Sequence, residues 1–450
     1  MFNLPDSEIL PLTMEHNFWT WSAQAKVNPI PVTHARGIYF WDAEGKRYMD
    51  FNSMTMCSNI GHGNERVIEA IAGQARELTY AGPGMATKPR AILGKLLSEI
   101  TPPGLDRFLY TLGGADANEN AIKLARAFTG RHKILARYRS YHGATSGAMA
   151  LTGDPRRWMW EPNLMPGVVH FLDPYRYRST FHRANPDISE QQFTQDYLNH
   201  LDEIIQLEGP DTIAAVLLET VTGTNGIIIP PQGYLQGVRA LCDRYGVLLI
   251  TDEVMSGFGR TGRWFAIDHW GVTPDIITMA KGITSAYLPL SATAVRKEIY
   301  EAFKGSEEYD YFRHVNTFGG NPAACALALK NLEIMENEQL FDRSRELGEY
   351  LKQSLASQLA DHPFVGDVRG KGLLVGIELV KDKESKEPLE VNLVNKVIGG
   401  CKGKGLIIGK NGATVAGYNN VLTLSPPLNI ETEDLEFIIQ TLTDELKAIQ

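Results

Sequence analysis

Short apolar runs alternate with helical patterns between about residues 105 and 300. The runs are Phe108–Leu112, Ile134–Tyr138, Val168–Leu172, Ala214–Glu219, Val247–Asp252, Ile276–Met279 and Ser291–Val295. Between them the spacing predicts helices such as Asp116–Phe128, whose apolar residues share one face. Apolar strands separated by helices indicate an α/β fold with a mostly parallel sheet covered on both faces. Ligands of such sheets bind beyond the carboxyl ends of the strands.

The N-terminal part has a different pattern. Gly37–Phe51 contains two alternating, aromatic-rich runs joined by Ala43-Glu44-Gly45, which predicts a β-hairpin. Further along, Asn321-Pro322 predicts the start of a helix, because Asn is a good N-cap and Pro fits the first helical position.

Beyond that helix we expect strands at Leu373–Leu379 and Val421–Leu424, and a last helix with apolar residues from Leu435 to Ile449. The chain is therefore divided into three parts. Residues 1–60 form an N-terminal segment and hairpin, residues 61–321 a large α/β domain, and residues 322–450 a small α+β domain that packs with the hairpin.

Composition and charge exclude several classes of protein. The formal net charge of −9 argues against nucleic-acid binding, which favours a basic surface. No apolar stretch approaches the roughly 18 residues of a membrane span, and no basic region precedes an apolar run at the N-terminus. The four cysteines, Cys57, Cys242, Cys325 and Cys401, form no paired spacing. We therefore expect neither disulfides nor a metal site, and a cytoplasmic location.

Two charged residues stand where a parallel sheet binds ligands. Asp252 ends the run Val247–Asp252, and Lys281 follows the run Ile276–Met279. Taken singly, Asp252 is as well explained as a turn or N-cap acid, and Lys281 as a solvated loop residue. Together they indicate an acid and an amine that face one crevice.

Two neighbouring motifs point to the same edge. Gly113-Gly114 lies between a strand and a helix, where free backbone amides and the helix dipole favour a phosphate. Tyr141 begins Tyr141-His142-Gly143 after the next strand, where its ring can stack on a flat ligand. The alternatives are a tight strand-to-helix turn and a core tyrosine.

These motifs, with Asp252-Glu253-Val254, GFGRTG at 257–262, Ala280-Lys281-Gly282 and TFGGNP at 317–322, resemble the class III (subgroup II) aminotransferases along nearly the whole chain. Among them, the ω-aminotransferases that use pyruvate are the most similar. The resemblance implies fold-type I, with a large domain around a seven-stranded sheet and a smaller α+β domain. It also implies pyridoxal 5'-phosphate as the cofactor.

The resemblance further implies a role for each matching residue. Lys281 would hold the cofactor covalently and move a proton, and Asp252 would keep the pyridine nitrogen protonated. Tyr141 would stack on the ring, and Gly114 and Ala115 would offer amides to the phosphate. Two further cofactor contacts are implied: Glu219 near the cofactor, and Thr317 reaching the phosphate of a neighbouring subunit. The active site would then lie at a homodimer interface, and whether two dimers form a tetramer is left open by the sequence.

The chain departs from the family pattern at three places. Gly113-Gly114-Ala115 lacks the hydroxyls usual around the phosphate, each contributing about 1.5–3 kcal/mol to a charged acceptor. Met56 stands where amine-accepting relatives often have Trp, either as a looser pocket wall or as core filler. No arginine follows Arg369, and Thr423 stands where relatives directed at α-amino acids have Arg.

These departures shape the expected substrate. Lys410 is the candidate cation for a substrate carboxylate or sulfonate, with a solvated loop lysine as the alternative. Trp21, Met56 and Lys410 are thus the candidate substrate residues, and the donor should have a terminal amine whose acid, where it has one, is distant. We expect a ping-pong ω-aminotransferase acting from such an amine to pyruvate or a similar keto acid. The alternatives are another pyridoxal-phosphate reaction on this fold (aminomutase, racemase, decarboxylase or phospho-lyase) and a non-catalytic binder.

Overall fold

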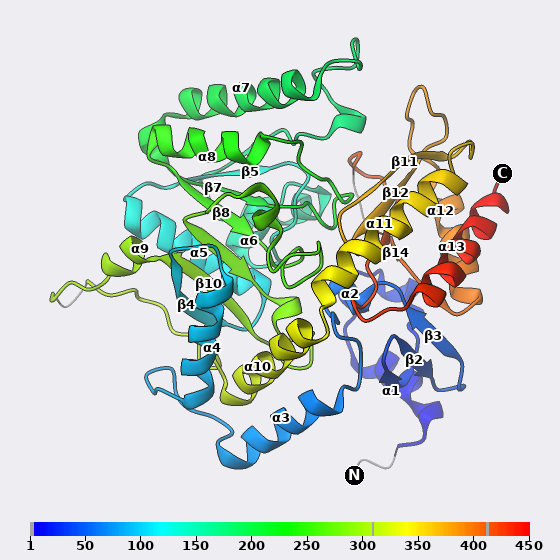
Figure 1. The fold of residues 1–450 in the computed structure, drawn as a ribbon, viewed down its shortest axis with the longest axis horizontal. Helices are drawn as coiled ribbons and strands as arrows, with labels where there is room; N and C mark the ends of the chain where they lie inside the picture. Colours follow the sequence, from blue (N-terminus) through cyan, green and yellow to red (C-terminus); the bar gives the residue numbers. More distant parts are fainter. Residues whose placement is uncertain (1–3, 308–309, 411–413) are drawn as a thin grey trace.

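The computed structural model describes residues 4–307, 310–410 and 414–450, and its centre is a seven-stranded sheet (Figure 1). In spatial order the strands are β4 (Leu105–Thr111), β10 (Ser291–Arg296), β9 (Ile276–Met279), β8 (Leu248–Asp252), β7 (Ile213–Glu219), β5 (Lys133–Arg137) and β6 (Val168–Phe171). The five strands from β9 to β6 pair in parallel, whereas β10 is antiparallel to both β4 and β9. The predicted mostly parallel sheet is confirmed, and every predicted apolar run contributes a strand.

Helices cover both faces of this sheet, because successive residues of a strand point to opposite sides. Leu217 of β7 packs in one cluster with Ala121 of α5 (Gly114–Thr129), a helix that matches the predicted one closely. Leu218, the next residue, packs in the other cluster with Val238 of α8 (Tyr234–Tyr245). An outer helix, α7, packs against α8 (Figure 1).

The remaining helices surround this sheet and the two chain ends. They are α1 (Ile9–His16), α2 (Ser53–Met56), α3 (Glu65–Glu77), α4 (Lys88–Ile100), α6 (Ser146–Leu151), α7 (Glu190–Glu208), α9 (Lys297–Glu301), α10 (Pro322–Asn337), α11 (Leu340–Gln358), α12 (Val391–Gly403) and α13 (Thr432–Lys447). The predicted start of α10 is confirmed, since the Asn321 side chain accepts hydrogen bonds from the amides of Ala323 and Ala324. None of the helices in the described ranges is both long and apolar enough to span a membrane.

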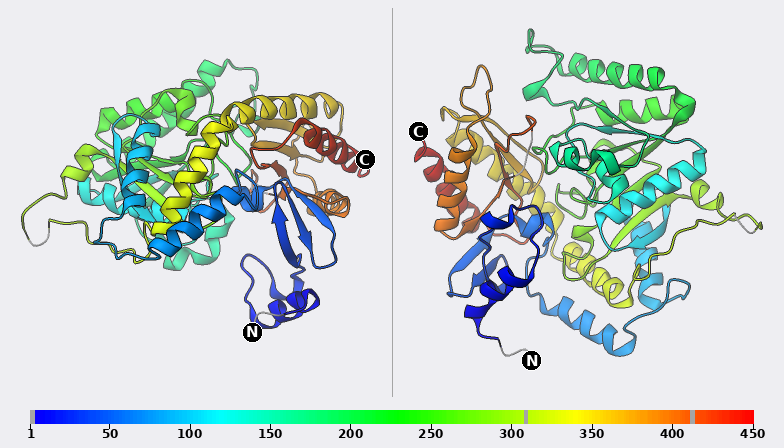
Figure 2. Two further views of the ribbon diagram at one scale, coloured as in Figure 1. Left: turned by 60° about the horizontal axis from the view of Figure 1, so that its bottom comes forward. Right: turned by 180° about the vertical axis from the view of Figure 1, so that it is seen from behind.

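Two four-stranded sheets are built from the ends of the chain. One contains β1 (Val32–Arg36), β2 (Tyr39–Asp42), β3 (Arg47–Asp50) and β13 (Leu406–Ile407), and the other β11 (Val365–Gly370), β12 (Val375–Leu379), β15 (Val421–Leu424) and β14 (Gly409–Lys410). The predicted hairpin is confirmed as β2–β3. Because β13 pairs in parallel with β3, the N-terminal strands share a sheet with C-terminal residues (Figure 2). The domain boundaries at residues 60 and 321 stay a prediction.

The turn at Ser53–Met56 is left-handed, with φ of 45°, 44°, 69° and 66° at its four residues. None of these residues is glycine, so the backbone is strained. Neighbouring groups hold the turn in place: Asp50 Oδ1 accepts from the Met54 amide at 3.1 Å, and Ser53 Oγ donates to the Ser425 carbonyl at 2.6 Å.

Candidate active site

A cavity of about 270 Å³ lies at the carboxyl ends of the parallel strands. Glu219 and Asp252 are the last residues of β7 and β8 and are paired in register, so both reach the same edge. The cavity is lined by Gly114, Ala115, Tyr141, His142, Gly143, Ala144, Glu219, Thr224, Asp252, Val254, Met255 and Lys281. The structure thus brings together six of the seven residues expected at the cofactor.

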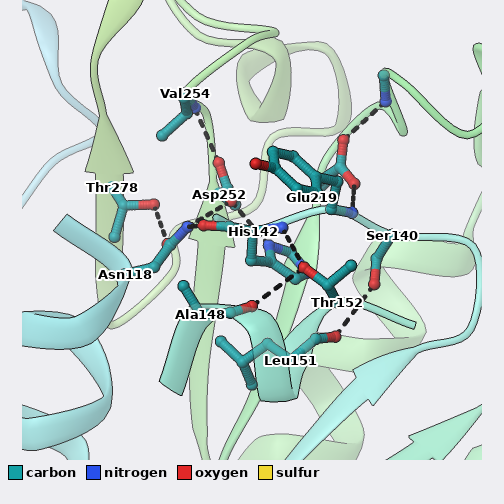
Figure 3. Close-up of polar contacts among 12 residues, drawn as sticks. Asn118, Ser140, His142, Ala148, Leu151, Thr152, Glu219, Asp252, Val254 and Thr278 are labelled. Atoms are coloured by element: carbon teal, nitrogen blue, oxygen red, sulfur yellow. Dashed lines mark hydrogen bonds and ion pairs between the residues drawn. The ribbon is translucent and has the colours of Figure 1, made fainter. Parts of the chain in front are cut away.

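Asp252 is 4% exposed and fixed by three donors (Figure 3). Its Oδ2 accepts from Asn118 Nδ2 at 2.8 Å and lies 2.7 Å from His142 Nδ1, and its Oδ1 accepts from the Val254 amide at 3.0 Å. A carboxylate offers about four lone-pair sites, so Oδ1 keeps acceptor capacity for a ligand. The position of the acid is therefore set before any ligand binds.

A second layer of polar groups fixes these donors (Figure 3). Asn118 Nδ2 also donates to the His142 carbonyl at 2.8 Å, and its Oδ1 accepts from Thr278 Oγ1 at 2.8 Å. The His142 amide donates to Thr152 Oγ1 at 2.9 Å. Sequence reasoning missed Asn118, Thr278 and Thr152, because each is an ordinary polar residue until the fold brings them together.

Glu219 is also buried and held by backbone amides. Its Oε1 accepts from the Tyr141 amide at 3.0 Å and its Oε2 from the Gly223 amide at 2.7 Å. Burial raises the pKa of the Glu219 carboxyl, and the neighbouring Asp252 raises it further, whereas His142 and both amides lower it. The carboxyl thereby joins the segment after β5 to the segment after β7.

Lys281 lines the cavity at a backbone position of φ 49°, unfavourable for a residue with a side chain. The next residue must be small, since a Cβ on Gly282 would lie 2.6 Å from Asn59 Nδ2. Asn331 Nδ2 donates to the carbonyls of Gly282 and Ile283 at 2.9 and 3.0 Å. These contacts hold the strained turn that presents the lysine.

Close packing also explains the glycines at the predicted phosphate end. A Cβ on Gly114, the first residue of α5, would lie 2.7 Å from Val254 Cγ1. Gly143 has φ of 140°, and a Cβ there would lie 2.5 Å from that of Ala115. Backbone amides at the start of α5 therefore reach the cavity without side chains in the way, an arrangement that suits an anion.

A second cavity, of about 600 Å³, adjoins the first through Thr224, which lines both. Arg156 lies beside two aromatic rings there: its guanidinium carbon is 3.9 Å from the ring centre of Tyr141 and 4.6 Å from that of Trp21, and the two ring centres are 6.2 Å apart. Arg156 Nε is 2.8 Å from Asp154 Oδ1, and its Nη2 donates to Thr224 Oγ1 at 2.9 Å. Its Nη1 has no partner among the described residues, so it stays available to a ligand.

Two of the three candidate substrate residues line the second cavity, and the third does not. Trp21 and Lys410 line the second cavity, where burial lowers the pKa of Lys410 and its Nζ donates to Asn395 Oδ1 at 2.7 Å. Of the two interpretations of Met56, pocket wall or core filler, the structure favours core filler, because Met56 lines neither cavity and is 2% exposed in the main hydrophobic core. The left-handed turn places Thr55 on the second cavity instead. Sequence reasoning missed Arg156, although its position shortly after Tyr141 was a usable signal.

Thr317 is the one expected cofactor residue that lies away from the cavity. It is exposed, and its carbonyl accepts from Tyr80 Oη at 3.0 Å. Large exposed side chains surround it, with Val315 78% and Phe318 57% exposed. Within one chain, therefore, Thr317 does not contribute to this site.

Comparisons with known proteins agree with this geometry. Residues 21–446 match the family model described as Aminotransferase class-III. The chain is 50% identical to the uncharacterized aminotransferase YhxA of Bacillus subtilis (strain 168), over 92% of this chain and 91% of that protein. It is 36% identical to the taurine–pyruvate aminotransferase of Bilophila wadsworthia (strain 3_1_6), over 99% and 98%.

A solved structure is also similar to this chain over its whole length. The taurine:2-oxoglutarate aminotransferase of Bifidobacterium kashiwanohense, solved with pyridoxal phosphate and glutamate, superimposes with a TM-score of 0.92 at 38% identity, over 100% of this chain and 99% of that one. A strained lysine and a fixed aspartate in one cavity, beside a family match over most of the sequence, lead to one conclusion. The chain belongs to the class-III aminotransferases, which transfer amino groups with pyridoxal 5'-phosphate as cofactor.

Proposed function

We propose that this enzyme transfers the amino group of a terminal amine with a distant acid group to pyruvate or a similar keto acid, in a ping-pong reaction. The observation that supports this most directly is Arg156, which lies against the rings of Tyr141 and Trp21 where the two cavities adjoin. A guanidinium with a free Nη1 suits a carboxylate or sulfonate. The name of the Bilophila relative, a taurine–pyruvate aminotransferase, agrees with such a donor. Simple amines and diamines remain candidate donors that would not use Arg156.

The first cavity has the groups that pyridoxal phosphate needs. Asp252 Oδ1 would accept from the pyridine nitrogen, the Tyr141 ring would lie against the flat face, and the amides of Gly114 and Ala115 would receive the phosphate. Glu219 would line the cofactor site through its fixed carboxyl. When bound, the cofactor supplies an aldehyde for amines and a ring that withdraws electrons.

The chain's own residues then have separate tasks. Lys281 Nζ would hold the cofactor between turnovers, and in turnover would take and return the proton at the substrate carbon that carries nitrogen. Asp252, fixed by Asn118 and His142, would keep the protonated pyridine nitrogen of the cofactor in place. Arg156 would orient the donor from its acid end, so that the amine points into the first cavity.

We also propose a homodimer in which Thr317 reaches the phosphate site of the partner subunit. The exposure of Thr317 beside the apolar side chains Val315 and Phe318 supports this, because such groups favour a protein interface. A cytoplasmic location is proposed from the four free cysteines, three of them buried, since a reducing compartment preserves thiols.

A donor panel tests the proposed substrate class. Taurine, β-alanine and an uncharged arylalkyl amine are each supplied with pyruvate, and alanine is measured. Arg156→Gln should raise the KM of the two acidic donors about tenfold or more, the value of one hydrogen bond between charged groups, and leave the uncharged amine nearly unaffected. Arg157→Gln, which removes a neighbouring arginine paired with Glu161, is the matched control. Equal losses for all donors would contradict the role of Arg156, and absence of alanine with every donor would contradict pyruvate as the acceptor.

Mixed dimers test the shared active site. Lys281→Ala and Thr317→Val chains are each expected to be weakly active or inactive alone. In a mixed dimer, one site combines an intact Lys281 with an intact Thr317 from the partner chain, so activity should reappear on mixing. If Thr317 served its own chain, mixing would restore nothing.

A further inference from the structure

A hollow of about 800 Å³ lies away from the catalytic cavity, between the segment that follows β6 and the C-terminal residues. Six of its lining residues are cations: Arg139, Arg176, Arg178, Arg183, Lys383 and Lys386. Its lining acids are Glu384 and Glu387, both exposed. Since the whole chain carries a formal charge of −9, this gathering of cations is not an average property of the surface.

Two of the cations are already neutralised by buried acids. Arg139 Nη1 lies 2.7 Å from Asp173 Oδ2, and Arg178 pairs with Glu378. Both carboxylate side chains are 0% exposed. The first pair joins the segments that follow β5 and β6, and the second joins the segment after β6 to β12, so their role is structural.

The other four cations have no acid partner among the residues that the structure describes. Lys386 Nζ donates to the Tyr177 carbonyl at 2.8 Å, Lys383 Nζ to the Ala360 carbonyl at 2.8 Å, and Arg176 also bonds only to carbonyls. Carbonyls carry no net charge and leave the positive charge of the hollow in place. Arg183 forms no hydrogen bond or ion pair with any residue that the structure describes.

These cations approach the hollow from two sides. Arg176 and Arg183 belong to the segment after β6, and Lys383 and Lys386 to the segment after β12. A ligand with two linked anionic groups can contact cations on both sides at once. The volume is that of a small-ligand pocket, and Arg forks suit phosphate oxygens.

We propose that this hollow binds a small polyanion with a diphosphate group. The diphosphate can be free or part of a nucleotide, because the hollow has room beyond the diphosphate itself. The site is separate from the catalytic cavity, with which it shares no lining residue.

Calorimetric titration of the cofactor-loaded enzyme with inorganic pyrophosphate at low salt tests this, because the bound cofactor occupies the catalytic phosphate site. Arg183→Gln is the first variant, since it breaks no contact within the fold, and Lys386→Gln is the second. Each should weaken the affinity about tenfold, the effect of one charge-assisted hydrogen bond. Arg76→Gln on α3, an exposed arginine at the opposite end of the molecule from α7 (Figure 1), removes the same charge and should leave the affinity unchanged.

Adenosine diphosphate serves as a second probe in the same titrations. Tighter binding than pyrophosphate would identify a nucleotide as the ligand, and equal or weaker binding a free diphosphate. The proposal is overturned when neither probe binds, or when binding is the same in Arg183→Gln and Lys386→Gln as in the unaltered enzyme. Because the readout is binding, the result is independent of the amine donor.

Discussion

Replacing Asn118 by Leu should weaken cofactor binding while preserving the fold. The change removes the donor 2.8 Å from Asp252 Oδ2 and the donor to the His142 carbonyl, and leaves Thr278 Oγ1 without its acceptor. A hydrogen bond to a charged group contributes about 1.5–3 kcal/mol, which corresponds to roughly ten- to a hundredfold in an equilibrium constant. We therefore expect the dissociation constant of pyridoxal phosphate to rise within that range, and kcat to fall because Asp252 is less firmly held.

The assay is titration of cofactor-free enzyme with pyridoxal phosphate, followed by absorbance, beside urea denaturation. Asn420→Leu is the matched control, since Asn420 is also fully buried and donates to the Leu379 carbonyl at 2.8 Å, just before β15 of the C-terminal sheet. Both variants should lose stability, but only Asn118→Leu should bind the cofactor weakly. Normal cofactor affinity in Asn118→Leu would refute the reasoning that the donors to Asp252 matter beyond stability.

Three further predictions concern strain, packing and pH. Met54→Gly should stabilise the protein by about 1 kcal/mol in urea denaturation, because glycine tolerates the φ of 44° at this position; a loss of stability would contradict strain there. Gly143→Ala should abolish tight cofactor binding in the same titration, since its Cβ would lie 2.5 Å from that of Ala115; unchanged affinity would contradict the packing argument. Burial raises the pKa of the Glu253 carboxyl to about 7, although hydrogen bonds from Ser256 and Thr220 partly oppose this rise. The folded state therefore holds this proton more tightly than the unfolded chain. The contribution of this proton to the free energy of unfolding is complete below the ordinary pKa of a glutamate and is lost as pH rises to about 7. Glu253→Gln cannot ionise, so its free energy of unfolding, measured by urea denaturation at several pH values, should vary less over that range.

The sequence was informative wherever local patterning decides structure. Apolar runs identified the strands of the large sheet, and the capping chemistry of Asn321 identified the start of α10. Because parallel strands end at one edge of the sheet, the sequence also predicted correctly that Asp252 and Lys281 face one cavity. The short strands β13 and β14 have no such signal, since each contains only two residues that pair with distant segments.

The details of the site depend on contacts that sequence spacing does not encode. Arg156 lies beside Trp21 only because a segment about 135 residues away in sequence folds back to it. The sequence left open whether Met56 lies at a pocket wall or in the core. A left-handed turn of four non-glycine residues, which no propensity would favour, directs it to the core. A local contact from Asp50 and a tertiary contact from Ser425 stabilise that turn.

The central claim is amino transfer from a terminal amine with a distant acid, through Lys281. It is tested most directly by adding taurine or β-alanine to the cofactor-loaded enzyme without a keto acid, while the visible absorption band of the cofactor is followed. The band should disappear with release of about one equivalent of aldehyde per site, and pyruvate should restore it with formation of one equivalent of alanine. An unchanged band with every terminal amine, or the same bleaching and recovery in Lys281→Ala, would contradict the account.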